Sequence, residues 1–84
     1  MNGLGWQPET IAYELTLPGP VTVEVWDLRG RRVATVFRGE RAIGRHADLW
    51  DGRDEGGRPV ASGTYLYRVA SAGVVRTGKV ACVR

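Results

Sequence analysis

The stretch from Trp50 to Val69 constrains the fold most, because two strand-like runs here flank the longest polar, glycine-rich loop in the chain. Three glycines and a proline between 51 and 59 interrupt any ladder of strand hydrogen bonds. From Thr64 onward the chain returns to an alternation rich in aromatic and β-branched residues. The stretch therefore predicts a strand, a long loop and a second strand.

The rest of the chain shows the same period of two. Apolar and polar side chains alternate in 11–16 and 21–26, and further strands are predicted at 31–37, 46–50 and 74–83, with a connection over 38–45. Turn signals recur about every 8 to 12 residues and no segment has a helical period. This pattern predicts an all-β fold, an immunoglobulin or fibronectin III-like β-sandwich of about seven antiparallel strands.

The turn at Asp27–Gly30 is specified in detail. An aspartate at the first position accepts a hydrogen bond from the backbone two residues on, and Gly30 supplies the left-handed conformation of a type I turn followed by a bulge. Tyr65 starts a late strand, where sandwich folds often use a tyrosine hydroxyl to bind a nearby backbone carbonyl. Both features predict local hydrogen bonds.

Two strands carry irregularities. Val33 and Val36, the expected core contacts of the returning strand, are three residues apart, which implies a bulge between them. In the strand that ends at Trp50, Asp48 shares its parity with the tryptophan. If Trp50 faces the core, Asp48 needs a position at the rim, an arginine partner or a local bulge, since a lone buried carboxylate is strongly disfavoured.

Charge is unevenly distributed. Residues 1–55 carry seven basic and nine acidic side chains, a net charge of −2, whereas residues 56–84 carry five basic and no acidic ones, which gives the overall +3. The five cations are spaced singly along expected strands, without the interleaved aromatic residues of a nucleic-acid groove. We therefore expect no nucleic-acid partner.

Neither an internal disulfide bond nor a membrane-spanning segment is expected. Cys82 is the only cysteine, so the chain forms no internal disulfide, and its pairing with another chain stays open. No apolar run approaches the roughly 20 residues of a membrane span, and the N-terminus lacks the pattern of a signal peptide. We predict no membrane insertion. Either the chain is cytoplasmic or it is a segment of a longer exported protein.

No catalytic or metal site is predicted. His46 is the sole histidine, and no serine or cysteine lies in a nucleophile-elbow context. Asp51, Asp54 and Glu55 lie close together, but Arg53 occupies a position where a calcium loop needs an oxygen donor. Asx-type turns and an ion pair to a nearby arginine are the favoured interpretation. We expect no enzyme activity, no cofactor and no metal.

A resemblance covers nearly the whole chain, from 7 to 84. The runs QPETIAYEL, VTVEVWDLRGRRV, GRHADLWDGRDEGGRPVASGTYLYRV and GKVACVR are similar, in order and spacing, to one immunoglobulin-like domain family. That family is shared by the C-terminal domains of flagellar hook-capping (FlgD-like) proteins and by the C-terminal sorting domains of type IX (Por) secretion. Asp48 departs from the pattern, because the family usually has an apolar residue there.

The resemblance implies a non-catalytic sandwich at the end of a larger exported bacterial protein. The expected function is C-terminal sorting or cell-surface attachment, and the alternative is a structural module of a hook-capping or other self-assembling extracellular protein. Lys79 and Arg84 are the expected receptor contacts. The matching structural positions are Asp27, Leu28, Gly30, Arg31, Trp50, Asp51, Gly52, Gly63, Tyr65 and Tyr67.

The resemblance also implies the organisation and partners. We expect an N-terminal tail or linker over 1–8 and the sandwich domain over 9–84. The implied partners are the preceding domains of the parent protein and a secretion translocon or cell-surface protein, with edge-strand pairing as a route to a homo-oligomer. The implied location is outside the cell, secreted or at the surface, as part of a longer polypeptide.

Overall fold

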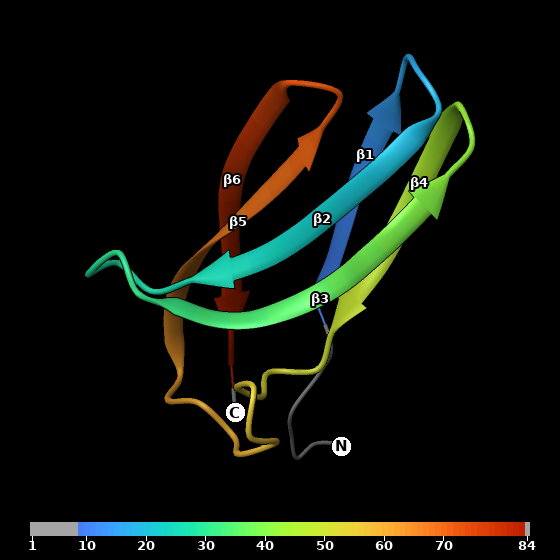
Figure 1. The fold of residues 1–84 in the computed structure, drawn as a ribbon. Coiled ribbons are helices and arrows are strands. Elements are labelled where there is room, and N and C mark those ends of the chain that lie inside the picture. Colours follow the sequence, from blue (N-terminus) through green and yellow to red (C-terminus); the bar gives the residue numbers. More distant parts are fainter. Residues whose placement is uncertain (1–8, 84) are drawn as a thin grey trace.

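The structure is a computed structural model of the 84-residue chain and describes residues 9–83. The linker predicted for 1–8 and the receptor contact predicted at Arg84 lie outside the described residues. The described part consists of six antiparallel β-strands and contains no helix (Figure 1). The strands are β1 (Glu9–Leu15), β2 (Gly19–Trp26), β3 (Arg32–Arg41), β4 (Gly44–Trp50), β5 (Gly63–Ser71) and β6 (Val74–Cys82).

Two sheets of unequal width form the sandwich. One contains β1 and β4, and the other contains four strands in the order β3-β2-β5-β6 (Figure 1). The all-β sandwich prediction is confirmed, although the described residues form six strands where about seven were predicted. Among these residues no helix is long and apolar enough to cross a membrane.

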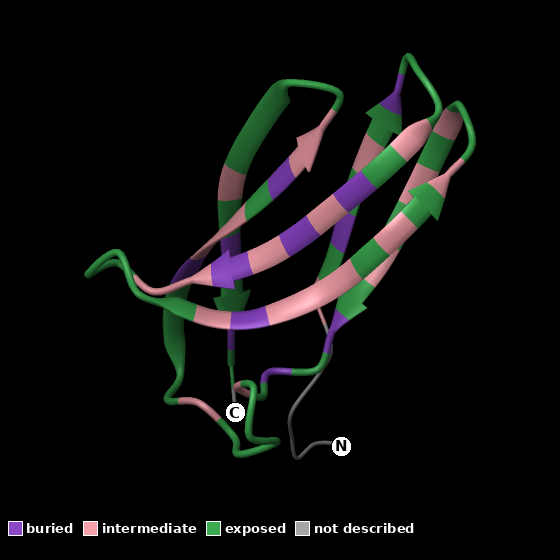
Figure 2. Ribbon diagram, viewed as in Figure 1, coloured by how far each residue is buried: buried purple, intermediate pink, exposed green. Residues whose placement is uncertain are grey.

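The core lies between the sheets and is built by the predicted alternation. In β2, the residues Val21, Val23 and Val25 are at most 1% exposed, while those between them are only partly covered (Figure 2). The β1 residues Ile11 and Leu15 meet them from the narrow sheet. This inward row exists because successive strand residues point to opposite faces, so a period of two places every second side chain in the core.

The hairpin of β2 and β3 is longer than expected. Residues predicted to be a connection form the end of β3, because Gly19–Thr22 pair with Arg38–Arg41. Pro20 is accommodated since β2 pairs with its other neighbour only from Val21 onward. The register shifts twice, once past Val36 and once past Val33, so the single predicted bulge is in fact two irregularities.

Asp48 faces inward with Trp50, and of the three solutions open to it the structure uses the arginine partner. Its carboxylate accepts hydrogen bonds from Arg41 Nη2 and from the Tyr13 hydroxyl, each at 2.7 Å. The Arg41 guanidinium also stacks on Phe37, 3.8 Å above the ring centre. Burial, followed by the hydrogen bond to Asp48, raises the pKa of Tyr13 to about 12. Three strands thus meet at one satisfied polar cluster.

Candidate protein-interaction face

The turn between β2 and β3 has the expected geometry. Asp27 Oδ1 accepts hydrogen bonds from the amides of Arg29 and Arg31, both at 2.9 Å. The Gly30 amide donates to the Asp27 carbonyl at 3.1 Å, and Gly30 has a φ of +86°. The amide of Arg31 is the main cause that lowers the pKa of Asp27, since a hydrogen bond to the carboxylate favours its charged form.

The loop between β4 and β5 repeats this turn at Asp54–Arg58. Asp54 Oδ1 accepts from the amides of Gly56 and Arg58 at 2.9 and 3.0 Å, and Gly57 has a φ of +82°. The Asp54 amide donates to the Arg58 carbonyl at 2.8 Å. In the same way, the Asp27 amide donates to the Arg31 carbonyl at 2.9 Å. The two segments share the pattern Asp-x-x-Gly-Arg and therefore the same hydrogen bonds.

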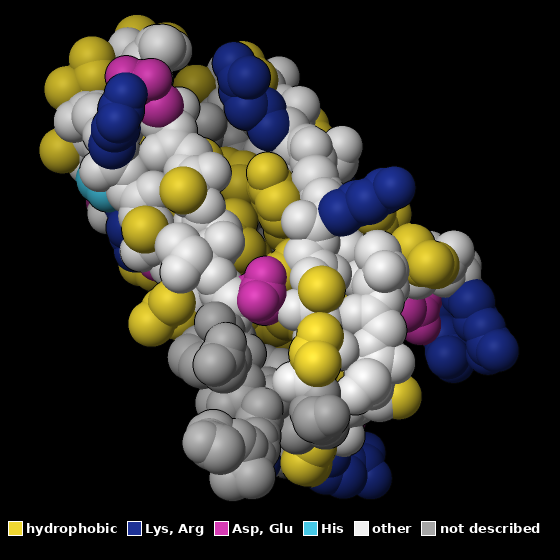
Figure 3. All heavy atoms as spheres, turned by 180° about the vertical axis from the view of Figure 1, so that it is seen from behind, with side chains coloured by type: hydrophobic (Ala, Val, Ile, Leu, Met, Phe, Trp, Pro, Cys, Tyr) yellow, Lys and Arg dark blue, Asp and Glu magenta, His cyan; other side chains and the backbone are white. Residues whose placement is uncertain are grey.

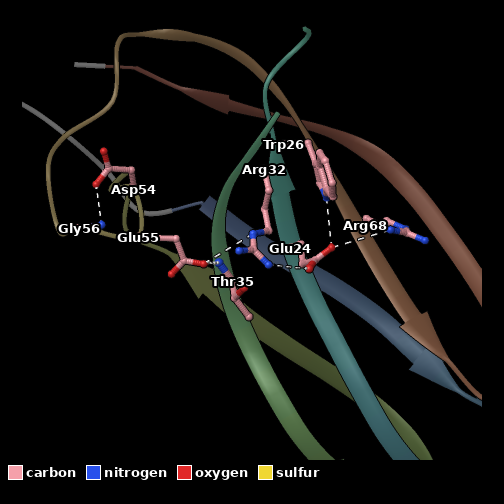
Figure 4. Close-up of polar contacts among 8 residues, drawn as sticks. All are labelled: Glu24, Trp26, Arg32, Thr35, Asp54, Glu55, Gly56 and Arg68. Atoms are coloured by element: carbon pink, nitrogen blue, oxygen red, sulfur yellow. Dashed lines mark hydrogen bonds and ion pairs between the residues drawn. The ribbon is translucent and has the colours of Figure 1, made fainter. Parts of the chain in front are cut away.

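The residue after Asp54 fastens this loop to the edge of β3. The Glu55 amide donates to the Val33 carbonyl at 3.0 Å. Glu55 Oε1 accepts from the Thr35 amide, also at 3.0 Å (Figure 4). Arg32 Nε lies 3.9 Å from the same carboxylate oxygen. Glu55 thus takes the place of a neighbouring strand at two backbone groups of an edge.

The predicted aromatic residues Trp50 and Tyr65 pack against each other in the core. Trp50 is 2% exposed, its indole N–H donates to the Arg53 carbonyl, and its ring meets Tyr65 edge-on at 5.2 Å. The Tyr65 hydroxyl donates to the Ala61 carbonyl at 2.6 Å, the corner hydrogen bond expected from the sequence. These contacts give both residues structural positions.

Glycines shape the rest of this region. Tyr67 is half-buried and lies across Gly78, where any added Cβ would overlap the ring. Gly52 is buried with a φ of +72°, and its carbonyl accepts from the Val60 amide at 3.0 Å. Gly63 opens β5 opposite Cys82.

The loop carboxylates bind the protein's own donors. Asp51 Oδ1 accepts from the Arg53 amide at 3.1 Å, and Arg58 pairs with Asp54 at 3.7 Å. Because Asp54 and Glu55 also accept amide hydrogen bonds, the three carboxylates point to separate partners. Within 9–83 no group of three acidic, histidine or cysteine side chains is placed to hold a metal ion.

The outer face of the four-stranded sheet carries a hollow that the sequence did not reveal. It has a volume of about 370 Å³, and its apolar lining comes from Trp26, Leu28 and Leu66. Leu28 is 67% exposed, and Leu66 is the cross-strand partner of Trp26. The signal in the sequence was an apolar residue at three outward positions, but only the strand register shows that they are neighbours.

A network of charges borders this hollow. Glu24 lies on β2 between two arginines, with Arg32 Nη1 at 3.7 Å and Arg68 Nη1 at 3.9 Å (Figure 4). Its Oε1 also accepts from the Trp26 indole N–H at 3.2 Å. The carboxylate fixes the indole beside the hollow and neutralises part of the arginine charge.

Lys79 lies at the same face. It pairs in register with Leu66, and no ion pair of its ammonium group is found within 9–83. The charged residues that line the hollow itself are Asp27 and Arg68, and Lys79 adjoins it through its register with Leu66. The receptor-binding role predicted for Lys79 stays a prediction, now with a defined surface around it.

Comparison with known proteins gave a matching family model and similar solved structures. The family model described as the FlgD Ig-like domain matches residues 3–73. The crystal structure of FLGD from P. aeruginosa superposes with a TM-score of 0.68 at 25% identity. The alignment covers 90% of this chain and 60% of that one, so the chain spans about three-fifths of its solved relative. No match was found among curated proteins.

The family match extends over more than four-fifths of the sequence and contains both Asp-x-x-Gly-Arg turns, at Asp27–Arg31 and Asp54–Arg58. The structural match agrees with it in fold. On these two findings, this chain belongs to the FlgD Ig-like domain family.

Proposed function

We propose that the chain is a non-catalytic structural module of an exported bacterial protein of the flagellar hook-capping type. The observation that carries the proposal is the family match over 3–73 together with the structural match to FLGD. Both fall on the hook-capping branch of the resemblance. Neither supports the sorting branch, which was the first expectation from the sequence.

The surface of the domain supports a role in protein–protein contact. An apolar hollow of about 370 Å³ lies on an open sheet face, lined by Trp26, Leu28 and Leu66 and by the charged residues Asp27 and Arg68, and Lys79 lies next to Leu66 on the neighbouring strand. Tryptophan and arginine in a pocket that a partner desolvates are typical of the residues that dominate binding energy at interfaces. The module acts as a rigid body that presents this face to neighbouring subunits.

The test is a deletion of residues 9–84 from the parent protein in its own bacterium. We expect cells that still export the shortened protein but assemble few or no complete hooks, as counted by electron microscopy and by swimming. Normal hooks would reject the hook-capping role. Loss of export with the rest of the protein intact would instead return the sorting function.

A point variant separates contact from folding. Lys79→Glu reverses the exposed charge without touching the core, so the purified domain should melt within about 2 °C of the original. If the face is used, the same variant in the parent protein should reduce hook assembly. Arg58→Glu, on an exposed loop away from the hollow, is the matched control and should leave assembly unchanged.

A further inference from the structure

The free edge of β3 holds a glutamate of the same chain in the position that a neighbouring strand would take. Among the described strands, β3 pairs only with β2. On its other side the Glu55 amide donates to the Val33 carbonyl, and Glu55 Oε1 accepts from the Thr35 amide. One residue of a parallel strand binds its neighbour in the same way, on both sides of a single residue. The Glu55 carboxylate therefore replaces the backbone carbonyl of such a strand.

Two arginines and one acidic residue line a hollow of about 290 Å³ at this edge. The lining consists of Arg32, Thr35, Arg38 and Glu55. Arg32 Nε lies 3.9 Å from Glu55 Oε1, and Arg32 Nη1 lies 3.7 Å from Glu24 on β2 (Figure 4). Arg38 is exposed and forms no ion pair within 9–83. The charge that lines the hollow is therefore +1 with Glu55 in place and +2 without it.

Cations on the opposite side of the molecule are distributed differently. Figure 3, which views the molecule from behind, shows lysine and arginine side chains scattered among hydrophobic and uncharged atoms. At the β3 edge, two arginines line one hollow together with a backbone amide that binds a carboxylate oxygen at 3.0 Å. Charged acceptors form stronger hydrogen bonds than neutral ones. The edge thus contains a carboxylate site, and Glu55 shows how it is filled.

Glu55 can leave this site without dismantling its loop. The turn is held by its own hydrogen bonds, because Asp54 Oδ1 accepts from two amides and Arg53 Nη1 donates to the Gly57 carbonyl at 2.9 Å. The Glu55 side chain is 53% exposed, so water already reaches the carboxylate. Exposed interactions of this kind contribute little to stability. Another carboxylate can therefore compete with Glu55 for the edge.

A second copy of the chain is a poor occupant. Two β3 edges that pair antiparallel about Thr35 would bring Arg32 of one copy opposite Arg38 of the other, and like charges directly opposite one another are destabilising. The register with β2 also shifts past Val33 and past Val36, so the edge is not a regular template for a long strand. The site therefore suits a single acidic residue of a different protein.

We propose that the β3 edge between Arg32 and Arg38 binds an exposed glutamate of another protein, and that Glu55 competes for this site from within the chain. The incoming glutamate donates its backbone N–H to the Val33 carbonyl, and its side-chain carboxylate accepts from the Thr35 amide. The two arginines select an acidic partner. This site shares no lining residue with the hollow at Leu66 and does not depend on the hook-capping role.

The experiment titrates the ¹⁵N-labelled Glu55→Ala chain with a capped peptide of sequence RDEGGR, which copies residues 53–58. We expect a shift of the Thr35 amide, and binding about fivefold tighter than to the unaltered chain, because Glu55 no longer competes. Two control peptides each remove one contact. Glutamine in place of glutamate removes the charge, and N-methylated glutamate removes the donor to Val33. Each should bind at least about fivefold more weakly.

A pair of arginine variants tests the selection by charge. Arg38→Ala should weaken binding of the glutamate peptide, both in the Glu55→Ala chain and, at higher peptide concentration, in the unaltered chain. The result thus does not rest on one variant. Arg45→Ala, at another exposed arginine without an ion pair within 9–83, is the matched control and should leave binding unchanged.

Three outcomes would overturn the proposal. The first is no shift of the Thr35 amide in Glu55→Ala with the glutamate peptide at about 5 mM, a concentration at which a site with a Kd of about 1 mM is mostly filled. The second is equal binding of the glutamate and glutamine peptides. The third is a dimer of Glu55→Ala in sedimentation that protects the Thr35 amide from exchange, which would make a second copy the occupant.

Discussion

The turns at Asp27–Arg31 and Asp54–Arg58 have the same pattern and the same hydrogen bonds, but they do different things. The first closes a hairpin, and its second residue, Leu28, is 67% exposed. In the other turn Glu55 occupies that position and binds two backbone groups of β3. The local motif determines the turn, and the residue at its second position determines whether the turn joins the rest of the fold.

The variant with the largest expected effect tests whether the contacts of Asp48 contribute more to the free energy of unfolding than either turn does. Asp48→Ala leaves Arg41 and the Tyr13 hydroxyl without their partner in a site where the two charged side chains are only 19% and 10% exposed. We expect a loss of about 2 to 3 kcal/mol in the free energy of unfolding, measured by urea denaturation. A loss below that of the turn variants would contradict this order.

Two controls sharpen that prediction. Replacing the cluster by Tyr13→Phe, Arg41→Met and Asp48→Leu together should recover most of the stability, because apolar packing can substitute for a buried ion pair. The raised pKa of Tyr13 adds a pH signature. The stability that the protonated Tyr13 hydroxyl contributes is fully present below about pH 10 and is lost as the pH rises towards 12. This alkaline loss should be absent in Tyr13→Phe.

Substitutions of the turn glycines test whether the loss in the free energy of unfolding is the same in both turns. Gly30 and Gly57 have nearly equal positive φ values, and both have open space around a Cβ. Valine at either position should cost about 1 to 2 kcal/mol from backbone strain. If the losses measured by thermal melting differ strongly, the two turns are not equivalent locally. Gly56→Ala, whose φ is not positive, is the control.

The second turn position gives a smaller and more specific contrast. Glu55→Ala removes one acceptor from an edge amide and should cost about 1 kcal/mol. Hydrogen exchange at the Thr35 amide should accelerate as well. Leu28→Ala, at the matched position of the other turn, should change stability by less than about 0.5 kcal/mol. Equal effects would show that Glu55 does not anchor the loop.

The smallest expected effect is a loss of stability at acidic pH. Because the pKa of Asp27 is lowered in the folded state, its stabilising contribution is present above the ordinary aspartate pKa of about 4 and is lost as the pH falls through the folded value. Arg31→Ala removes the guanidinium but keeps the amide, which is the main cause. Carboxyl NMR titration should therefore still give a lowered pKa. Recovery of the ordinary value would assign the shift to the side chain.

Local features were predictable from the sequence to a useful degree. The Asp27 turn and the Tyr65 hydroxyl bond follow from residues within four positions of each other, and the inward row of β2 follows from its period of two. The arginine partner of Asp48 was one of three open solutions. Its identity as Arg41 depends on how β3 and β4 meet, which no local pattern states.

The candidate sites were less accessible to prediction. The hollow beside Leu66 requires the register between β2 and β5. About seven strands were expected, whereas the described residues form six, in sheets of two and four strands. The sequence also gave no sign that Glu55 would reach β3, since the two segments are separated by 20 residues.

The single thiol of Cys82 provides a built-in reporter. Its side chain is 2% exposed on β6, next to the end of the described chain. A maleimide or disulfide reagent will reach the sulfur only when the last strand detaches, so the labelling rate measures how often the sandwich opens. The same burial withholds the sulfur from oxidants and from the thiols of other molecules while the strand remains paired.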